Sequence, residues 1–327
     1  MTRLAMAHQT DRQRRRVPRT PRDAFTLIEL LIVIAVIALM VGLLFPALRS
    51  VRQSSGLVRE LSTARQLMVA YRAYAYDHRG TLMPGYYSAL DAGVDEPLPA
   101  TNEAGIPVAD LVAGVEGTLT AARYPWRIAP YLDYNLKALY LDKFLLDRFA
   151  NDRFIESALL MSVFPSLGLN ATFLGGDSQL QAFDLPPAID RYYAARISEI
   201  TYPPQLIVFA SSRFNGQSAP DGRLIEGYHK LRPPNTPFGL APSWLQQYSR
   251  ECESPDCDTG KFGFVSLRHP GHRAAIGFFD GHTGTLTYGF DPNSPNGDPG
   301  IEDNIRDMRH WAPQANRFDW ELQIQVP

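Results

Sequence analysis

The sequence predicts an α+β protein in which a long amino-terminal helix packs on a small antiparallel β-sheet head, with a helical insertion before the sheet. Three observations predict this fold. A run of 19 uncharged residues, Leu30–Leu48, follows a basic leader. A polar–apolar pattern of helical period continues after that run. Short apolar runs bounded by turn residues follow in the carboxy-terminal third, and this arrangement is typical of a small sheet.

The leader, residues 1–24, is strongly basic: seven arginines stand against two aspartates, a net charge of +5. A basic segment beside an apolar helix stays on the cytoplasmic side of a membrane. At ~1.5 Å per residue, a helix of 19 residues nearly spans a hydrocarbon core of ~30 Å. The sequence therefore predicts a transmembrane helix over residues 25–48, with the rest of the chain on the far side.

Glu29 is the only charged residue between the leader and Leu48. A carboxylate in the bilayer costs on the order of a few kcal/mol, and residues that bear this cost are usually functional. Two interpretations stay open. In the first, Glu29 reaches back to the lipid headgroups and has no specific role. In the second, it pairs with a cation. That cation is a leader arginine while the leader is attached, and a free amine at Phe25 if the leader is cut off.

The helical pattern continues over residues 49–80 as an exported amphipathic segment. Apolar residues recur there at three- to seven-residue spacing: Val51, Val58, Leu61, Met68, Tyr71 and Ala75. Gly80 indicates the end of the helix, and Pro46 predicts a kink within it. The apolar half has nothing to bury against within one small domain, so the pattern indicates packing against copies of itself.

Residues 81–327 are expected to form an exported globular head. Frequent Pro and Gly predict loops over residues 84–130, and apolar residues at helical intervals predict helix over 135–164. Four segments are predicted to be strands: residues 205–210, 262–267, 273–279 and 283–288. Asp280-Gly281, between the last two runs, is typical of a two-residue hairpin turn.

Charge and motifs exclude several classes of function. The leader holds seven of the 32 basic and two of the 34 acidic side chains, so the chain without it has a net charge of about −7. This charge argues against general nucleic-acid binding. The sequence contains no phosphate-binding glycine loop, Gly-x-Ser-x-Gly elbow or His-Glu-x-x-His pair. We therefore expect no enzymatic activity and no cofactor.

Four residues near the carboxy end are of types that bind metals: His269, His272, Asp280 and His282. The predicted strand of residues 273–279 lies between the two pairs and is roughly 23 Å long at ~3.3 Å per residue. A shared metal site is therefore disfavoured. The preferred interpretation is a hairpin turn, with hydrogen-bonding or surface roles for the histidines.

Cys252 and Cys257 are the only cysteines. Two nearby cysteines in an exported domain favour a disulfide that closes a short loop, over free thiols or half a metal site.

An oxygen-rich loop follows the last predicted strand and contains Asp291, Asn293, Asn296, Asp298, Glu302 and Asp303. Such loops bind calcium in some proteins. The spacing matches no EF-hand pattern, so a solvated loop is the preferred interpretation and a calcium site at Asp291, Asn293, Asn296 and Asp298 the alternative.

Residues 24–48 resemble the prepilin-type cleavage and methylation signal of type IV pilins and type II secretion pseudopilins. The resemblance rests on the basic leader, the apolar run, Glu29 as the fifth residue from Phe25, and Pro46 as the 22nd. It implies cleavage between Ala24 and Phe25, N-methylation of Phe25, and pairing of Glu29 with a neighbour's Phe25 amine during assembly. The family usually has Gly where Ala24 stands, so slower or absent processing stays open.

A second resemblance is to a pilin-like group known by its H-X9-DG signature. It rests on His269 and Asp280-Gly281, and on the blocks 168–176 and 200–210. Ten residues separate His269 from Asp280, one more than the name of the signature states.

The resemblances imply a non-enzymatic pilin-like subunit of a type II secretion pseudopilus or type IV pilus-like filament. It would wait in the bacterial inner membrane as a single-pass protein with a cytoplasmic amino terminus and a periplasmic or extracellular head. The implied partners are prepilin peptidase, copies of itself, other pilin-like subunits, the assembly machinery and membrane lipid. The alternative is a membrane-tethered exported binding or enzymatic domain that uses the signal only for targeting.

Overall fold

The computed structural model describes residues 27–87, 100–111, 115–151, 154–181, 192–214, 223–235, 244, 262–288 and 305–316. These residues form helices and one small antiparallel sheet, so the predicted α+β class is confirmed. The chain divides into two compact units, Met1–Val51 and Arg52–Pro327.

Helix α1 comprises Leu27–Asp77, and its helical backbone continues through Pro46. The helix ends where Arg79 and Gly80 adopt positive φ angles of 55° and 83°. The Gly80 amide donates to the Ala75 carbonyl at 2.8 Å, which is the bonding of a Schellman cap. The predicted helix end is therefore confirmed.

In the first unit, the large apolar side chains of residues 27–43 are exposed, with Leu27 at 88% and Leu43 at 73%. Within the residues that the structure describes, no helix is long and apolar enough to cross a membrane. The transmembrane helix expected over residues 25–48 stays a prediction.

In the second unit, α1 buries one face. The fully or almost fully buried apolar residues of this face are Ala64, Leu67, Met68, Ala70, Tyr71 and Ala75. The predicted stripe is therefore right for Met68, Tyr71 and Ala75. It is wrong for Val58, which is 66% exposed, because Val58 lies about 120° around the helix from Ala64 at 3.6 residues per turn.

The sheet has four strands in the order β1-β2-β3-β4, and each neighbouring pair is antiparallel. The strands are β1 (Leu167–Leu169), β2 (Ile207–Ser211), β3 (Arg273–Phe278) and β4 (Thr283–Thr287). The last three confirm the strands predicted over residues 205–210, 273–279 and 283–288, with small shifts at their ends. The sequence does not predict β1, because three residues are too short to show a period.

Residues 262–267 do not form the predicted strand. Gly263 and Phe264 both have positive φ, 59° and 63°, and Val265 makes only an isolated bridge to Ser212. Two consecutive left-handed residues turn the chain. Apolar composition alone does not reveal such a turn.

The hairpin between β3 and β4 has a longer loop than predicted. The Gly281 amide donates to the Phe278 carbonyl at 2.9 Å, and the Phe278 amide donates to the His282 carbonyl at 3.0 Å. The loop is therefore the three residues Phe279, Asp280 and Gly281, and Gly281 has a φ of 99°. Such loops end in a residue with positive φ, which glycine adopts without a steric penalty.

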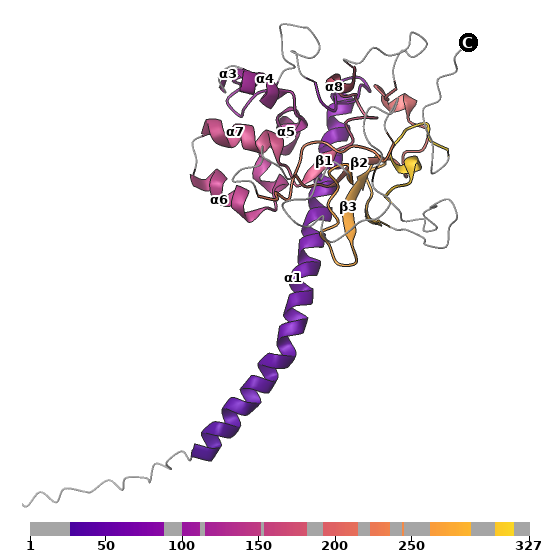
Figure 1. Cartoon of the computed structure of the whole chain (residues 1–327). Coiled ribbons are helices and arrows are strands. Elements are labelled where there is room, and N and C mark those ends of the chain that lie inside the picture. The colour runs from indigo at the N-terminus through magenta and orange to yellow at the C-terminus, as the bar shows by residue number, and fades with distance from the viewer. Residues whose placement is uncertain are drawn as a thin grey trace, which may run out of the picture. The chain divides into compact units, whose positions relative to one another are not determined.

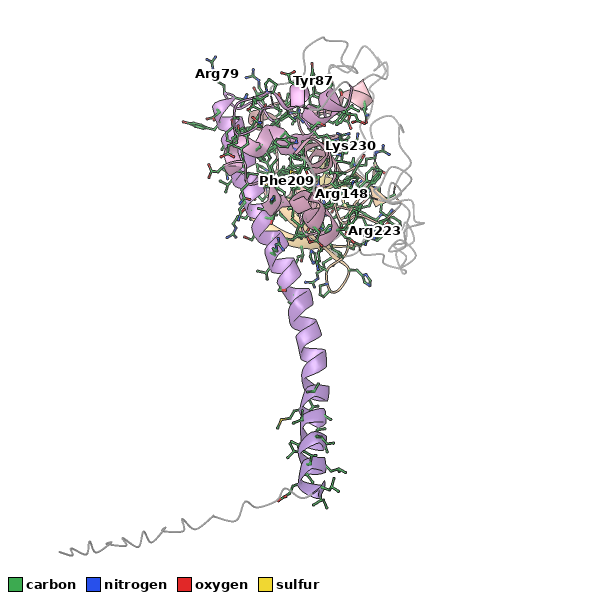
Figure 2. The ribbon with its side chains drawn as sticks, turned by 90° about the vertical axis from the view of Figure 1, so that its left-hand side faces the viewer. Arg79, Tyr87, Arg148, Phe209, Arg223 and Lys230 are labelled. Carbon is green, nitrogen blue, oxygen red and sulfur yellow. The ribbon has the colours of Figure 1, made fainter. Side chains whose placement is uncertain are left out.

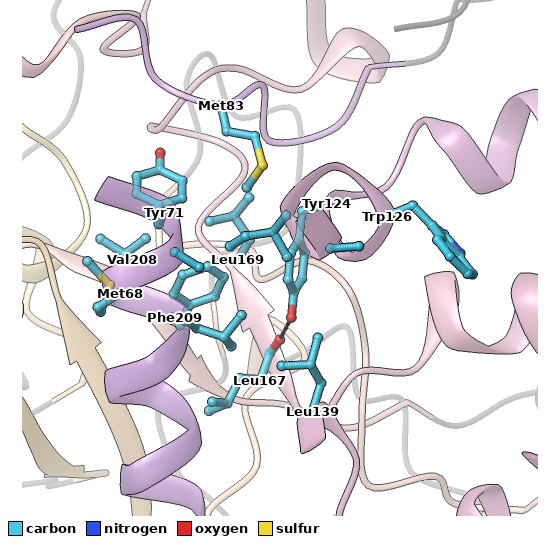
Figure 3. Close-up of a cluster of buried hydrophobic side chains, with 14 of the residues drawn as sticks. Met68, Tyr71, Met83, Tyr124, Trp126, Leu139, Leu167, Leu169, Val208 and Phe209 are labelled. Atoms are coloured by element: carbon cyan, nitrogen blue, oxygen red, sulfur yellow. Dashed lines mark hydrogen bonds between the residues drawn. The ribbon is translucent and has the colours of Figure 1, made fainter. Parts of the chain in front are cut away.

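One face of the sheet packs on α1. The rings of Tyr71 and Phe209 meet edge to face, with centroids 5.8 Å apart, and Figure 3 shows Met68 and Tyr71 of α1 beside Val208 and Phe209 of β2. A Cβ at Gly277 would lie 3.0 Å from the Met68 Cγ atom. The missing side chain of Gly277 therefore lets β3 approach the helix closely.

The opposite face of the sheet covers a second core, in which Ile207, Ala274 and Ile276 cluster with Trp311. The buried amide of Asn170 connects the two layers by donating to the Ile207 carbonyl at 3.1 Å and to the Trp311 carbonyl at 2.9 Å. Both faces of the sheet are thus covered. This explains why every residue of β2 is buried.

The α-helices of the head are short: α3 (Val108–Leu111), α4 (Val115–Ala121), α5 (Tyr124–Ile128), α6 (Lys143–Asn151), α7 (Phe154–Val163) and α8 (Ser178–Gln181). The 3₁₀ turns among the described residues are η1 (Ala129–Leu132), η2 (Leu136–Leu139), η3 (Ile197–Glu199) and η8 (Met308–His310). In Figure 1, α3–α7 gather on one side of the upper part of α1, and β2 and β3 lie on the other.

Two predictions for this region need correction. Residues 84–130, predicted as loops, include α3, α4 and α5. The helix predicted over 135–164 consists of η2, α6 and α7, because Asp142 starts a new helix by accepting the Phe144 amide at 2.9 Å. The insertion is joined to the sheet by Tyr124, whose hydroxyl donates to the Leu167 carbonyl at 2.6 Å (Figure 3).

Candidate functional site

A buried ion cluster joins α1 to the segment before β3. The Glu60 side chain has no exposed surface. Arg268 forms a bidentate ion pair with it: Arg268 Nε donates to Glu60 Oε2 at 3.1 Å, and Arg268 Nη2 donates to Glu60 Oε1. Arg268 also donates to Glu226 at 2.8 Å and to the carbonyls of Ser212 at 2.7 Å and Ser166 at 2.9 Å. All five N–H groups of this guanidinium are therefore satisfied.

His269 completes the cluster. Its Nε2 atom bonds Glu60 Oε2, and the residue is 7% exposed. Of the two roles expected for the histidines, hydrogen bonding or a place on the surface, His269 therefore has the first. Its partner lies on α1, 209 residues earlier in the chain.

The cluster perturbs its ionisable groups strongly. Burial opposes ionisation of Glu60, but the positive charge of Arg268 and the hydrogen bond from His269 outweigh it and hold the pKa of Glu60 below its usual value of 4.5. Burial also opposes the charge of Arg268, yet Glu60 and Glu226 raise the pKa of its guanidinium. Glu60 is thus a buried carboxylate kept ionised by its partners.

The far end of β3 contacts α1 a second time. Arg72 donates from Nη1 to the Asp280 carbonyl at 2.9 Å. The Asp280 carboxylate accepts from the His282 amide at 3.0 Å and lies 2.5 Å from His282 Nδ1. Burial opposes ionisation of Asp280, but the bonds from His282 and the charge of Arg72 outweigh it and lower the pKa of Asp280.

These contacts explain the arrangement of the histidine and the Asp-Gly pair. His269 precedes β3 and binds Glu60, whereas Asp280 follows β3 and binds Arg72. Glu60 and Arg72 are about 18 Å apart along α1 at 1.5 Å per residue. The six residues of β3, which lies between His269 and Asp280, span about 20 Å at ~3.3 Å per residue. The two ends of the motif therefore fasten β3 along the helix.

A pocket of about 600 Å³ opens beside the ion cluster. It is lined by residues of α1, of the start of α6 and of two loops: Ser55, Gly56, Arg59, Leu141, Asp142, Lys143, Phe144, Arg223, Glu226, Arg268 and His269. All of these residues belong to the second unit.

A separate polar group is buried deeper in the head. Lys230 pairs with Asp177 at 2.9 Å and lies 4.7 Å from the centre of the Tyr86 ring. Arg127 is 4% exposed and donates to the Ala122 carbonyl at 2.9 Å. Burial lowers the pKa of Arg127 to about 10, and among the described residues it has no acidic partner within ion-pair distance.

Several predicted site residues lie outside the described residues: the cleavage site Ala24 and Phe25, the pair Cys252 and Cys257, and the loop residues Asp291, Asn293, Asn296, Asp298, Glu302 and Asp303. Glu29 is described. It lies exposed in the first turn of α1, where the helix dipole favours an acidic side chain. Within the described part of the chain, no group of three or more His, Cys, Asp or Glu is placed to hold a metal ion.

Sequence reasoning missed Glu60, Arg268 and Glu226. A signal for Glu60 exists: it stands four residues before Ala64 and eleven before Tyr71, on the same helical face as the buried stripe. A carboxylate on the apolar face of a helix requires a buried cation. The sequence does not identify that cation, because Arg268 is 208 residues away.

Residues 19–45 match the family described as a prokaryotic N-terminal methylation motif. The match covers the end of the leader, the Ala24–Phe25 junction, Glu29 and most of the apolar run, so the chain carries a type IV pilin-like signal. No curated protein and no solved structure matches the chain. The resemblance of the head to the H-X9-DG group stays a prediction.

Proposed function

We propose that this chain is a non-enzymatic, pilin-like subunit that assembles through α1 into a filament of the type II secretion pseudopilus or type IV pilus class. The observation that carries the proposal is the methylation motif at residues 19–45. A basic leader, a small residue before an aromatic one, an acidic residue five positions into the mature chain and a long apolar run occur together there.

In this function the precursor sits in the bacterial inner membrane with its leader in the cytoplasm. Seven arginines in the leader support that orientation. Prepilin peptidase cuts between Ala24 and Phe25 and methylates the new amine. Because the cut precedes the apolar run, the run stays in the mature subunit, unlike the apolar stretch of a secretory signal.

The surface of α1 supports assembly. Its residues 27–43 expose an almost continuous apolar surface, from Leu27 at 88% to Leu43 at 73%. Burying such a surface in lipid, and then against other helices, is favourable. Glu29 is the polar exception, and it pairs with the Phe25 amine of a neighbouring subunit, because a carboxylate in an apolar bundle requires a cationic partner.

The head supports the same function through its attachment to α1. Glu60 and Arg72 hold the two ends of β3, and Tyr71 packs into the core between them. When force is applied to a subunit by way of α1, the head must keep its position along that helix. The buried ion cluster resists sliding of the head along α1, because such a displacement would leave an unpaired charge in an apolar core.

A membrane-tethered binding domain is the second candidate function. The observation that favours it is the pocket of about 600 Å³ in the head, whose volume is in the range of small-molecule sites. In that case the signal serves targeting alone, and Glu29 has no role in assembly.

Mass spectrometry of the amino terminus of the native protein tests the proposal. The expected species begins at N-methyl-Phe25. A charged bulky residue at position 24, as in Ala24→Arg, is expected to leave the precursor uncut, whereas Ala24→Gly preserves or speeds cleavage. A mature chain that begins after Leu48 would contradict the proposal, because it would have lost the apolar helix.

A further inference from the structure

The pocket beside the ion cluster is lined by positively charged side chains from three separate segments of the chain. Arg59 comes from α1, Lys143 from the first residue of α6, and Arg223 from the loop that precedes Ile225. Their side chains lie on the lining of one hollow of about 600 Å³. Three like charges that share a pocket repel one another, and a bound anion among them relieves that repulsion.

The carboxylates of the pocket are already engaged by other groups. Asp142 accepts the Phe144 amide at 2.9 Å through Oδ1 and the Glu226 amide at 3.2 Å through Oδ2. Glu226 accepts from Arg268 at 2.8 Å and from the Ser266 hydroxyl at 2.8 Å. These bonds engage both oxygens of Asp142 and the Oε2 atom of Glu226.

The three cations have weaker partners. To the residues that the structure describes, Arg59 makes one long hydrogen bond, from Nη2 to the Tyr140 carbonyl at 3.5 Å. The guanidinium of Arg223 lies 4.6 Å from the centre of the Phe144 ring, a contact that orients it without neutralising it. None of the three forms an ion pair within the part of the chain that the structure describes, and all three are exposed.

We propose that this pocket binds a phosphate-type oxyanion between Arg59, Lys143 and Arg223. A phosphate has several oxygens and up to two charges, so it can bind three cations of one pocket, whereas one carboxylate does not. The planar fork of arginine matches two phosphate oxygens at once, and the lysine ammonium adds a point charge. The volume leaves room for the organic group of a phosphate ester.

Two kinds of ligand carry such an oxyanion. One is a soluble phosphate or phosphomonoester, and the other is the headgroup of an anionic phospholipid. The lipid source rests on the proposed membrane location. It is consistent with the sequence, because Arg59 follows the end of the apolar run at Leu48 by only 11 residues.

The test uses the full chain in a non-ionic detergent, titrated with inorganic phosphate and with glycerol 3-phosphate by isothermal calorimetry. A second arm uses nanodiscs of phosphatidylglycerol or of phosphatidylcholine, with hydrogen exchange of residues 141–144 and 223–226 as the readout. Saturable binding is expected in detergent. Arg223→Gln and Lys143→Gln are each expected to weaken it about tenfold, the effect of losing one charged hydrogen bond.

Arg79→Gln is the matched control. It removes the same charge from an exposed arginine at the far end of α1, and Figure 2 shows Arg79 well away from Arg223. If soluble phosphate binds and its binding does not change with the lipid of the nanodisc, the ligand is a soluble phosphate or phosphomonoester. Protection in phosphatidylglycerol but not phosphatidylcholine, lost in Arg223→Gln, assigns the lipid source.

The proposal is overturned if neither probe gives saturable binding, or if Arg79→Gln weakens binding as much as Arg223→Gln. Far-ultraviolet circular dichroism of each variant confirms that it is folded. The result is independent of filament assembly, because the pocket lies wholly in the second unit. A chain that binds phosphate yet is not cleaved at Phe25 would contradict the proposed function alone.

Discussion

Glu60 in α1 is held by the guanidinium of Arg268, a residue 208 positions later in the chain. The bond joins the helix to the segment that starts the β3–β4 hairpin. Because Glu60 has no exposed surface, neither residue is replaceable alone without leaving an unpaired charge in the core. The ion pair therefore fixes where along α1 the sheet docks.

Glu60→Gln is expected to lower the free energy of unfolding by about 3 kcal/mol at pH 7, since Arg268 loses one of its carboxylate partners. The pKa of Glu60 is lowered from 4.5 in the folded protein. Its ionised form therefore stabilises the fold above pH 4.5, and this contribution is lost as the pH falls further below that value. Urea unfolding of the full chain in detergent, followed by tryptophan fluorescence, measures the difference. A difference that stays constant from pH 7 to pH 3 would contradict the lowered pKa of Glu60 in the folded protein, because only a pKa that differs between the folded and unfolded states makes stability depend on pH.

Arg268→Met and Arg127→Met are expected to differ in their cost. The first leaves Glu60 buried without its main counter-charge and should cost about 3–5 kcal/mol. The second removes a buried cation that has only carbonyl partners among the described residues. It should cost less than about 2 kcal/mol, because relief of desolvation offsets the lost hydrogen bonds. Equal losses in thermal or urea unfolding would contradict the assigned role of Arg268.

Gly277→Val is expected to destabilise the head by about 1–3 kcal/mol, because the added side chain pushes into Met68 and the backbone of α1. Gly284→Val is the matched control on the neighbouring strand. A Cβ there lies 3.4 Å from the Phe278 ring, an ordinary contact, and the change should be within about 0.5 kcal/mol. Similar unfolding midpoints for the two variants would argue that β3 has room beside the helix.

Glu29→Gln and Glu29→Leu are expected to insert into the membrane and to be cleaved normally, yet to fail to join filaments. The neutral side chains remove the partner of the neighbour's Phe25 amine, while insertion becomes easier without an intramembrane charge. Sheared filaments and precursor processing are compared in the same cells. Wild-type incorporation of Glu29→Leu would exclude the assembly role and would favour the tethered-domain function.

Cys252 and Cys257 are expected to be oxidised to a disulfide in the exported protein. Alkylation under native conditions should label neither cysteine, and alkylation after reduction should label both. Because the loop is short, reduction should lower stability only modestly. Full labelling without a reductant would refute the disulfide.

Local patterns predicted the elements whose signal lies in neighbouring residues. The period of Met68, Tyr71 and Ala75 identified the buried face of α1, and short strand-like segments on either side of a turn identified β3 and β4. The same reasoning failed at residues 262–267, where positive φ angles at Gly263 and Phe264 interrupt the extended backbone and leave only an isolated bridge between Val265 and Ser212. It also missed β1, which exists only because β2 pairs with it.

The sequence by itself determined the signal at residues 19–45, the long helix, its end at Gly80 and the glycine turn after Asp280, because each depends on the chemistry of adjacent residues. Only the tertiary structure decided what His269 and Asp280 do. Separated by a strand, they do not meet; each instead holds α1, through Glu60 and Arg72. The physical reason is that a buried charge pairs with whichever opposite charge the fold brings within bonding distance of it. No spacing along the chain encodes a bond between residues 209 positions apart.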